Sequence, residues 1–310
     1  MNQTRRKFLQ NTAVVTAASM LAPMQNISAN PFKNIKAKAG YELLFMQTDW
    51  GFDGNRDEFC AAAKKEGYEG IEVWWPGEEK AIKELFDAVK KHGLQIGFLC
   101  AGSSANPAEH FAQFKSNLDA VCANTYQKPV YVNCHSGKDY FTYEENKKII
   151  DYVTAKSKSS GIPVYHETHR SRMMFAAHVA RNFAEKNQDL RFTLDISHWC
   201  NVHESLLSDQ KQTIDFILGK TDHIHSRIGH PEGPQVNDPR APEWDNVVKA
   251  HLAWWDQVIE RKKKNGERMT ILTEFGPADY MPTLPYTRQP LADQWAINVY
   301  MMNLLRKRYQ

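Results

Sequence analysis

The sequence predicts a single (β/α)8 TIM barrel, an architecture of the α/β class. A β-prone apolar run followed by a segment of helical periodicity recurs eight times, and no stretch rich in Ser, Gly or Pro divides the units. In addition, four of the runs end in Glu, Asp or His. Alternating strands and helices are typical of a parallel sheet, and eight such units close into a barrel. The 310 residues, 42% of them hydrophobic, are enough for a sizeable core.

The predicted strands are short β-prone runs bounded by glycine or polar residues. They span residues 41–46, 70–75, 94–100, 130–134, 163–170, 190–195, 223–228 and 269–275. The predicted helices show apolar residues at helical spacing and end near glycine or basic residues. They span residues 56–65, 78–91, 106–123, 142–159, 173–186, 210–218, 244–262 and 292–305.

A doubly wound open sheet is the alternative arrangement of such units. It is disfavoured because no Gly-x-Gly-x-x-Gly turn follows the first strand, so a dinucleotide-binding fold lacks its signature. The longest predicted loop, 229–242, follows the seventh strand and contains four prolines. We expect it to form a shaped wall over the top of the barrel.

The N-terminus carries features of an export signal. Arg5 and Arg6 precede an uncharged, moderately apolar run at 12–22, and small residues suited to cleavage follow. This pattern resembles a twin-arginine signal peptide, which makes 1–29 the signal and 30–310 a single mature domain in the periplasm. The alternatives are a basic start to a cytoplasmic helix and a membrane span, for which this run has only about half of the roughly 20 residues needed.

Charge and cysteine content limit the classes of partner. Without Arg5, Arg6 and Lys7, the total of Lys and Arg falls from 39 to 36 and equals the 36 Asp and Glu. A near-neutral mature chain argues against nucleic acid or a membrane surface as partner. Five cysteines with no Cys-x-x-Cys pair indicate neither a disulfide framework nor a zinc ribbon, so we expect buried thiols.

Four successive predicted strands end in residues that bind metal ions. These residues are Glu167, Asp195, His225 and Glu274. Side-chain alternation places Tyr165 and His169 on the same strand face as Glu167. Because parallel strands end at one rim of a barrel, the four residues predict a divalent-metal site. Three carboxylates and one imidazole favour Mn²⁺ or Mg²⁺, with Co²⁺ or Zn²⁺ as alternatives.

On these residues the sequence resembles the xylose-isomerase-like TIM-barrel superfamily, which includes sugar isomerases, ketose 3-epimerases, inosose dehydratases and endonuclease IV. The resemblance covers nearly the whole predicted mature chain. The motifs that carry it are Glu167, Leu-Asp195-x-x-His198, His-x-His225-x-Arg227 and Thr-Glu274-Phe-Gly.

Similarity to ketose 3-epimerases implies that these four residues bind one divalent ion, and that Glu167 and Glu274 also transfer protons. A Lewis acid stabilises the enediolate formed when a carbon beside a sugar carbonyl loses its proton. Two carboxylates on opposite faces of the substrate can remove and return that proton. The function implied is an isomerase or epimerase of a non-phosphorylated sugar or keto-sugar.

Several further residues are predicted to contact substrate. In the family, the histidine that matches His198 contacts substrate oxygens, and several relatives carry a cation near the position of Arg227. A capping histidine and a surface salt bridge are the alternative interpretations of these two residues. His223 shares the face of His225 one layer deeper, so it is predicted to pack beneath the site and not to bind metal.

At the rim, His135 and His169 are expected to contact substrate, with ordinary polar rim residues as the alternative. Glu72 is expected to point inward near the site. Trp75 is predicted to stack on the apolar face of a sugar, although adjacent aromatics such as Trp74 and Trp75 also pack in cores.

Three other functions remain as alternatives. A lyase or dehydratase, acting for example on a keto-glycoside, begins with the same proton abstraction and stays open. An endonuclease IV-like phosphodiesterase requires three metals and a DNA-binding face, against which the neutral charge counts. A non-enzymatic sugar-binding barrel does not require two opposed carboxylates. The expected partner is therefore a small sugar, with no nucleic acid and no membrane for the mature form. A homo-oligomer is left open.

Overall fold

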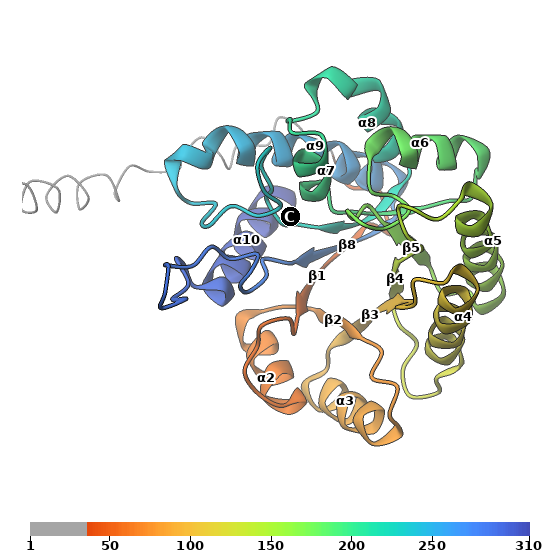
Figure 1. The fold of residues 1–310 in the computed structure, drawn as a ribbon. Coiled ribbons are helices and arrows are strands. Elements are labelled where there is room, and N and C mark those ends of the chain that lie inside the picture. Colours follow the sequence, from red (N-terminus) through yellow and green to blue (C-terminus); the bar gives the residue numbers. More distant parts are fainter. Residues whose placement is uncertain (1–35) are drawn as a thin grey trace, which may run out of the picture.

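The computed structural model describes residues 36–310, which form a closed barrel of eight parallel strands in the order β1 to β8. The strands are β1 (Glu42–Thr48), β2 (Gly70–Trp74), β3 (Gln95–Ala101), β4 (Tyr131–His135), β5 (Val164–Glu167), β6 (Phe192–Leu194), β7 (Thr221–His225) and β8 (Arg268–Thr273). In Figure 1 the strands surround the centre and the helices lie outside them. The predicted (β/α)8 class is confirmed, while the predicted signal at 1–29 lies outside the described residues.

The helices follow the strands as expected, with one addition. They are α2 (Arg56–Glu66), α3 (Glu79–His92), α4 (Pro107–Ala123), α5 (Tyr143–Ser160), α6 (Ala177–Lys186), α7 (Ser197–Val202), α8 (Lys211–Leu218), α9 (Asp245–Asn265) and α10 (Gln294–Tyr309), with 3-10 turns η1 (Ser208–Gln210) and η2 (Pro242–Trp244). Helix α7, directly after β6, was not predicted. Across 36–310 no helix combines the length and apolar character needed to span a membrane.

Local signals in the sequence explain where several helices begin and end. Asn55 and Thr142 each form a capping box. The side chain of the capping residue accepts a hydrogen bond from the backbone N–H three residues later, and the glutamate at that later position accepts one from the backbone N–H of the capping residue. Gly67 and Gly161 end the same two helices in the left-handed conformation. Helix α6 begins at Ala177, later than the predicted 173, because a turn precedes it.

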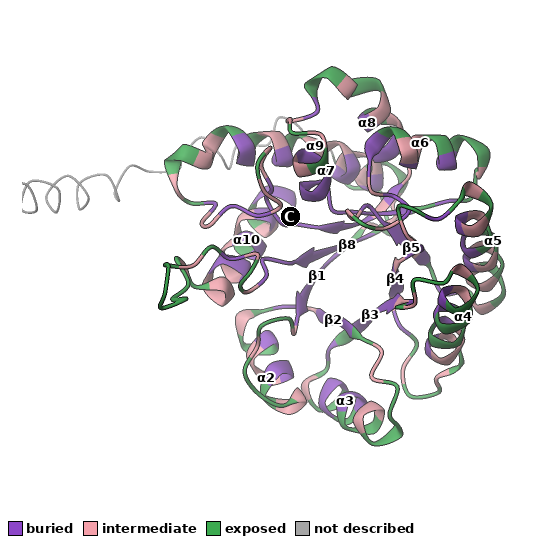
Figure 2. Ribbon diagram, viewed as in Figure 1, coloured by how far each residue is buried: buried purple, intermediate pink, exposed green. Residues whose placement is uncertain are grey.

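Side chains along the strands alternate between two layers. The outward residues, such as Phe45, Val73 and Val132, pack under the helices in the main hydrophobic core. Figure 2 shows this as buried strands enclosed by helices whose outer faces are exposed. The inward residues form a smaller apolar cluster in the barrel. It contains Leu44, Met46, Tyr131 and Leu272, with Val130 and Tyr165 packed against it.

Above this small cluster the barrel interior becomes polar. On β4 the buried residue that follows Tyr131 on the inner face is Asn133, and on β2 the inner residue is the buried Glu72. Barrel interiors are usually filled by branched apolar side chains, and active sites lie at the carboxyl ends of the strands. The polar upper half therefore identifies the functional end of the barrel.

The five cysteines are free, as expected, and Cys122 alone among them is not fully buried.

The last helix is anchored to α9 by a buried ion pair, whose loss should be costly. Arg308 donates to both carboxylate oxygens of Asp256 at 2.7 Å, and the Tyr309 hydroxyl donates to the same carboxylate at 3.0 Å. Asp256→Ala leaves a buried guanidinium without its carboxylate, so we expect the free energy of unfolding to fall by about 3–5 kcal/mol. Urea unfolding monitored by circular dichroism measures this loss.

Asp87→Ala is the matched control, because Asp87 forms an exposed pair with Lys83 at 2.6 Å. It should cost no more than about 1 kcal/mol. Equal losses in the two variants would show that the buried pair does not anchor the last helix.

Candidate functional site

The four predicted metal ligands meet at the carboxyl end of the barrel. Glu167 and His225 are the last residues of β5 and β7, whereas Asp195 and Glu274 follow the ends of β6 and β8. All four are buried, with exposed fractions of 1, 0, 0 and 8% in that order. The alternation of strand side chains thus brings residues far apart in the sequence into one buried cluster.

Distances within the cluster are short. His225 Nδ1 lies 2.8 Å from Glu274 Oε2 and 3.8 Å from Glu167 Oε2. One ligand atom from each of Asp195, His225 and Glu274 lies within 4.8 Å of the other two. The same holds for Glu167, Asp195 and His198. The two groups share Asp195, so the predicted ligands and His198 form one continuous cluster.

The donor set fits a hard divalent cation. Asn133 donates a 2.6 Å hydrogen bond to Glu167 Oε2, while Glu167 Oε1 has no hydrogen-bond partner among the described residues. Burying a carboxylate oxygen without a partner is unfavourable, and coordination to a cation relieves that cost. Glu167, Asp195, Glu274 and His225 are the side chains that would hold the ion.

The buried carboxylates of the cluster stabilise a positive charge placed among them. Although burial lowers the pKa of His225, the carboxylates of Glu274, Glu72 and Glu167 outweigh it and raise that pKa well above its usual range. Burial raises the pKa of Asp195 to about 6, opposed by Arg227 and reinforced by Glu274 and Glu167. Because a ligating histidine must be neutral, metal binding at His225 would release a proton.

Arg227 lies beyond the end of β7, not within the strand as predicted, and its buried guanidinium reaches into the cluster. It forms an ion pair with Asp195, and its Nη2 lies 3.3 Å from Glu274 Oε2. Ser197, the first residue of the unpredicted helix α7, accepts a 3.3 Å hydrogen bond from Arg227 Nε. Arg227 is therefore a buried member of the site and not a surface salt bridge.

Glu72 lies directly beneath His225 and is fully buried. Its carboxylate accepts a 2.6 Å hydrogen bond from Tyr131 and lies 3.1 Å from His223 Nε2 and 3.3 Å from His225 Nε2. The pKa of Glu72 is raised by burial but lowered further by His225 and His223, so it stays ionised. The structure places Glu72 and His223 as supports of His225.

Three histidines line the rim between β4 and α7. His135 Nε2 lies 2.8 Å from Glu167 Oε2, and the ring centroids of His135 and His169 are 4.7 Å apart. The rings of His169 and His198 are 3.8 Å apart. Burial, reinforced by neighbouring cationic groups, holds the pKa of His169 and of His198 well below the usual range. Both are neutral near pH 7 and can donate one hydrogen bond and accept another.

The two adjacent tryptophans take opposite sides of β2. Trp74 lies edge-on to His135, with ring centroids 5.3 Å apart. Trp75 packs against Phe98 of the main core, 5.2 Å between centroids, and so does not join the cluster. The tryptophan beside the site is therefore Trp74 and not Trp75, the residue for which stacking was predicted.

Sequence reasoning missed two aromatic residues at the rim. The rings of Trp50, after β1, and Tyr280, after β8, meet edge to face at 5.0 Å. The guanidinium of Arg227 lies 4.6 Å from the centre of the Tyr280 ring and that of Arg170 lies 4.9 Å from it. Both aromatics come from loops, where no periodicity indicates which way a side chain points. Asn133 was also missed, although its spacing from His135 would have identified it.

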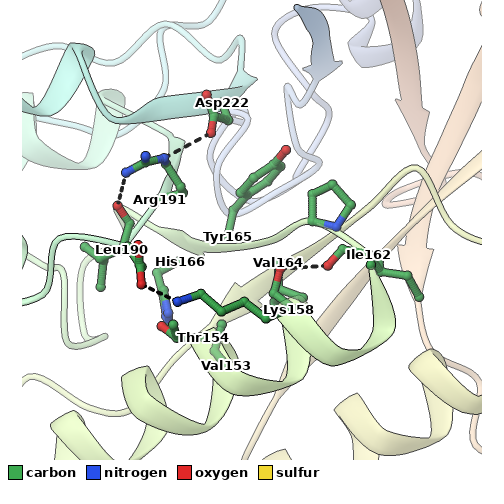
Figure 3. Close-up of a pocket in the computed structure, with 14 residues that line it drawn as sticks. Val153, Thr154, Lys158, Ile162, Val164, Tyr165, His166, Leu190, Arg191 and Asp222 are labelled. Atoms are coloured by element: carbon green, nitrogen blue, oxygen red, sulfur yellow. Dashed lines mark hydrogen bonds and ion pairs between the residues drawn. The ribbon is translucent and has the colours of Figure 1, made fainter.

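A separate cavity of about 410 Å³ lies at the start of β5, near Pro163, and so at the opposite end of the barrel. Its charged groups are paired: Lys158 with Asp189 at 2.5 Å, and Arg191 with Asp222 at 3.6 Å (Figure 3). It contains none of the clustered metal-binding side chains. We therefore assign the candidate site to the carboxyl end.

No protein-family model matches this chain, and no curated protein matches it. Solved structures match its fold. One is a D-tagatose 3-epimerase-like protein, with a TM-score of 0.58 and 12% identity over 86% of this chain and 98% of that chain. Another is the probable 3-DHS dehydratase AsbF, involved in petrobactin synthesis, from Bacillus anthracis. Its TM-score is 0.55, with 14% identity over 86% of this chain and 99% of that chain.

A third is an AP endonuclease, family 2, from Brucella melitensis, with a TM-score of 0.53 and 15% identity over 84% of this chain and 98% of that chain. At these identities the likenesses show the fold alone. The three named activities differ, so the side chains at the carboxyl end must supply the functional argument.

Removing the one imidazole of the predicted ligand set should strongly weaken metal binding. His225→Ala leaves three carboxylates without the central group that both Glu167 and Glu274 approach. We expect the purified protein to hold one divalent ion per chain after dialysis against Mn²⁺, and the variant to bind it at least about 100-fold more weakly. Elemental analysis and calorimetric titration measure content and affinity.

His178→Ala, at an exposed histidine of α6, is the control and should keep the ion. Full metal content in His225→Ala would rule out this ligand set.

Proposed function

We propose that this protein is a divalent-metal-dependent isomerase or epimerase of a free sugar or keto-sugar. The observation that supports it is that two carboxylates, Glu167 at the end of β5 and Glu274 directly after β8, both lie near His225 Nδ1, at 3.8 and 2.8 Å. These two strands are three steps apart in the closed barrel, so they come from nearly opposite walls. A substrate lying between them presents one face to each carboxylate.

Each carboxylate has a defined role in this proposal. Glu167 removes a proton from the carbon beside the carbonyl, and Glu274 returns one from the other side; the reverse direction exchanges the roles. A bound divalent cation supplies Lewis-acid stabilisation of the enediolate. Burial raises the pKa of Glu167, but His135 and His225 outweigh burial and hold it well below its usual range. Glu167 is therefore ionised and able to accept a proton.

Neighbouring side chains orient the sugar. Neutral His198 and His169 can exchange hydrogen bonds with hydroxyl groups, and Tyr280 and Trp50 present aromatic faces at the rim. Arg227 offsets the charge of Asp195 and Glu274, which limits repulsion among the buried carboxylates.

A lyase is the second candidate, favoured by the likeness to a probable dehydratase. It shares the first step, loss of the proton to a carboxylate, and differs in expelling a β-leaving group. The carboxylic acid formed in the first step can supply the proton that the leaving group needs, and neutral His198 can donate a hydrogen bond to that group.

Substituting either glutamate by glutamine should remove proton transfer while preserving size. We expect Glu167→Gln and Glu274→Gln each to lower turnover by about 10²–10⁴-fold, because general acid–base groups contribute on that scale. A panel of free ketoses and keto-glycosides is incubated in D₂O and followed by NMR. Deuterium at the reprotonated carbon is expected for an epimerase, and loss of the leaving group identifies a lyase.

Glu232→Gln, in an exposed position of the 229–242 loop, is the control and should leave turnover unchanged. Full activity in both active-site variants would contradict the proton-transfer mechanism. So would conversion without solvent deuterium, since a hydride would then migrate between carbons.

We also propose that the chain is exported folded by the twin-arginine route, on the basis of Arg5 and Arg6. Arg5→Lys combined with Arg6→Lys should retain the precursor in the cytoplasm, as measured by cell fractionation. Lys7→Arg preserves the charge and serves as the control. Unchanged periplasmic accumulation of the double variant would refute this route.

A further inference from the structure

A groove of about 880 Å³ opens next to the candidate site. Trp74 forms part of its wall, and that ring contacts His135 edge-on at 5.3 Å. His135 Nε2 in turn lies 2.8 Å from Glu167 Oε2. The Trp74 and His135 side chains therefore connect the groove to Glu167 of the metal-binding cluster.

Two cations line this groove without a carboxylate partner. Lys138 and Arg172 both contribute to the lining, and neither forms an ion pair with any carboxylate in the described part of the chain. Arg172 Nε is buried and lacks a hydrogen-bond partner within residues 36–310. Burial and the neighbouring charge of Arg172 lower the pKa of Lys138, against a smaller opposing effect of Asp139. Two adjacent half-buried cations of this kind attract an anion.

The backbone holds these two cations side by side. Lys138 lies in the β4–α5 loop, where its carbonyl accepts a 3.0 Å hydrogen bond from the Asn146 side chain. Met173, which follows Arg172, donates its backbone N–H to the carbonyl of Ser136 at 3.0 Å. That bond ties the β5–α6 loop to the β4–α5 loop, so the backbone segments that carry the two cations are held next to each other.

The part of the groove lined by the β3–α4 segment is also preformed. Gln113 of α4 accepts hydrogen bonds from the backbone and hydroxyl of Ser103, at 2.9 and 3.0 Å, and from the backbone of Ser104 at 3.0 Å. Asn117 donates to the Ala101 carbonyl at 3.0 Å. These bonds fix the loop after β3, which also lines the groove.

We propose that the groove is a subsite for an anionic sugar unit joined to the unit that reacts between Glu167 and Glu274. The sugar ring stacks on Trp74, 46% of whose surface is exposed, and its oxyanion is held by Lys138 and Arg172. A uronate carboxylate and a sulfate ester present the same oxyanion chemistry. The proposal rests on the proposed function for the chemistry of the sugar unit between Glu167 and Glu274, whereas binding of the anionic unit in the groove does not depend on it.

The test compares sugars that differ in charge. Glucuronate, glucose 6-sulfate and glucose are titrated into chelator-treated mature protein, with binding measured by ligand-observed NMR. We expect each anionic sugar to bind at least about 10-fold more tightly than glucose, because a charge-assisted hydrogen bond contributes on that scale. The tighter of the two anions identifies the source of the oxyanion.

Variants then locate the binding. Lys138→Ala combined with Arg172→Ala should reduce both anions to the affinity of glucose, whereas Lys138→Arg combined with Arg172→Lys should retain the preference. Lys147→Ala with Arg181→Ala, at surface cations paired to carboxylates four residues on, should change nothing. Thermal unfolding checks that each variant is folded.

Three results would overturn the proposal: equal affinity for charged and neutral sugars, a preference that survives in Lys138→Ala/Arg172→Ala, or a preference seen only in metal-loaded protein and lost in Glu167→Gln. The last would mean that the acid chelates the metal. Because these titrations need no turnover, charge preference without deuterium exchange would refute the proposed function alone. Exchange without charge preference would refute the subsite alone.

Discussion

The candidate site depends on the buried imidazole of His225, both of whose nitrogens face carboxylates. Nδ1 lies 2.8 Å from Glu274 and Nε2 lies 3.3 Å from Glu72. A buried carboxylate without a partner is strongly unfavourable, so these groups must satisfy one another. Glu72 is held from below by a hydrogen bond from Tyr131. The Tyr131 ring has room because residue 97 is glycine: a Cβ there would lie 2.6 Å from the ring. One side of the His225 ring is thus oriented from beneath the site by Glu72 and Tyr131, and the other side faces Glu274.

The fold separates the residues that stabilise it from those that form the site. Most of the apolar burial lies between the outer faces of the strands and the helices, and a small apolar cluster around Tyr131 and Leu272 closes the barrel below. The upper interior is therefore free to hold charged groups. Their mutual attraction is strong because they are shielded from water, and the same shielding makes a missing partner costly.

Strand periodicity predicted much of this arrangement. Alternation along β5 placed Tyr165, Glu167 and His169 on the inner face, and the structure agrees: the Tyr165 ring stacks on Tyr131 in the barrel. The same rule applied to β2 from Glu72 selects Trp74, so the expectation for Trp75 was inconsistent with that for Glu72. The rule fails beyond the strand ends. The positions of Tyr280, Trp50 and helix α7 depend on contacts between distant loops, for which the sequence carries no period.

The shared fold does not decide among activities, since a dehydratase, an epimerase-like protein and an endonuclease have it in common. That choice depends on the side chains at the carboxyl end, where His135, His169 and His198 lie beside the carboxylate cluster and His135 also contacts Trp74 of the groove. In our proposal, a substrate that spans the carboxylate cluster and the groove would be held by its charge at one end and would react at a carbonyl at the other. Under that proposal, a sugar that carries a charged substituent would suit the site better than a simple ketose.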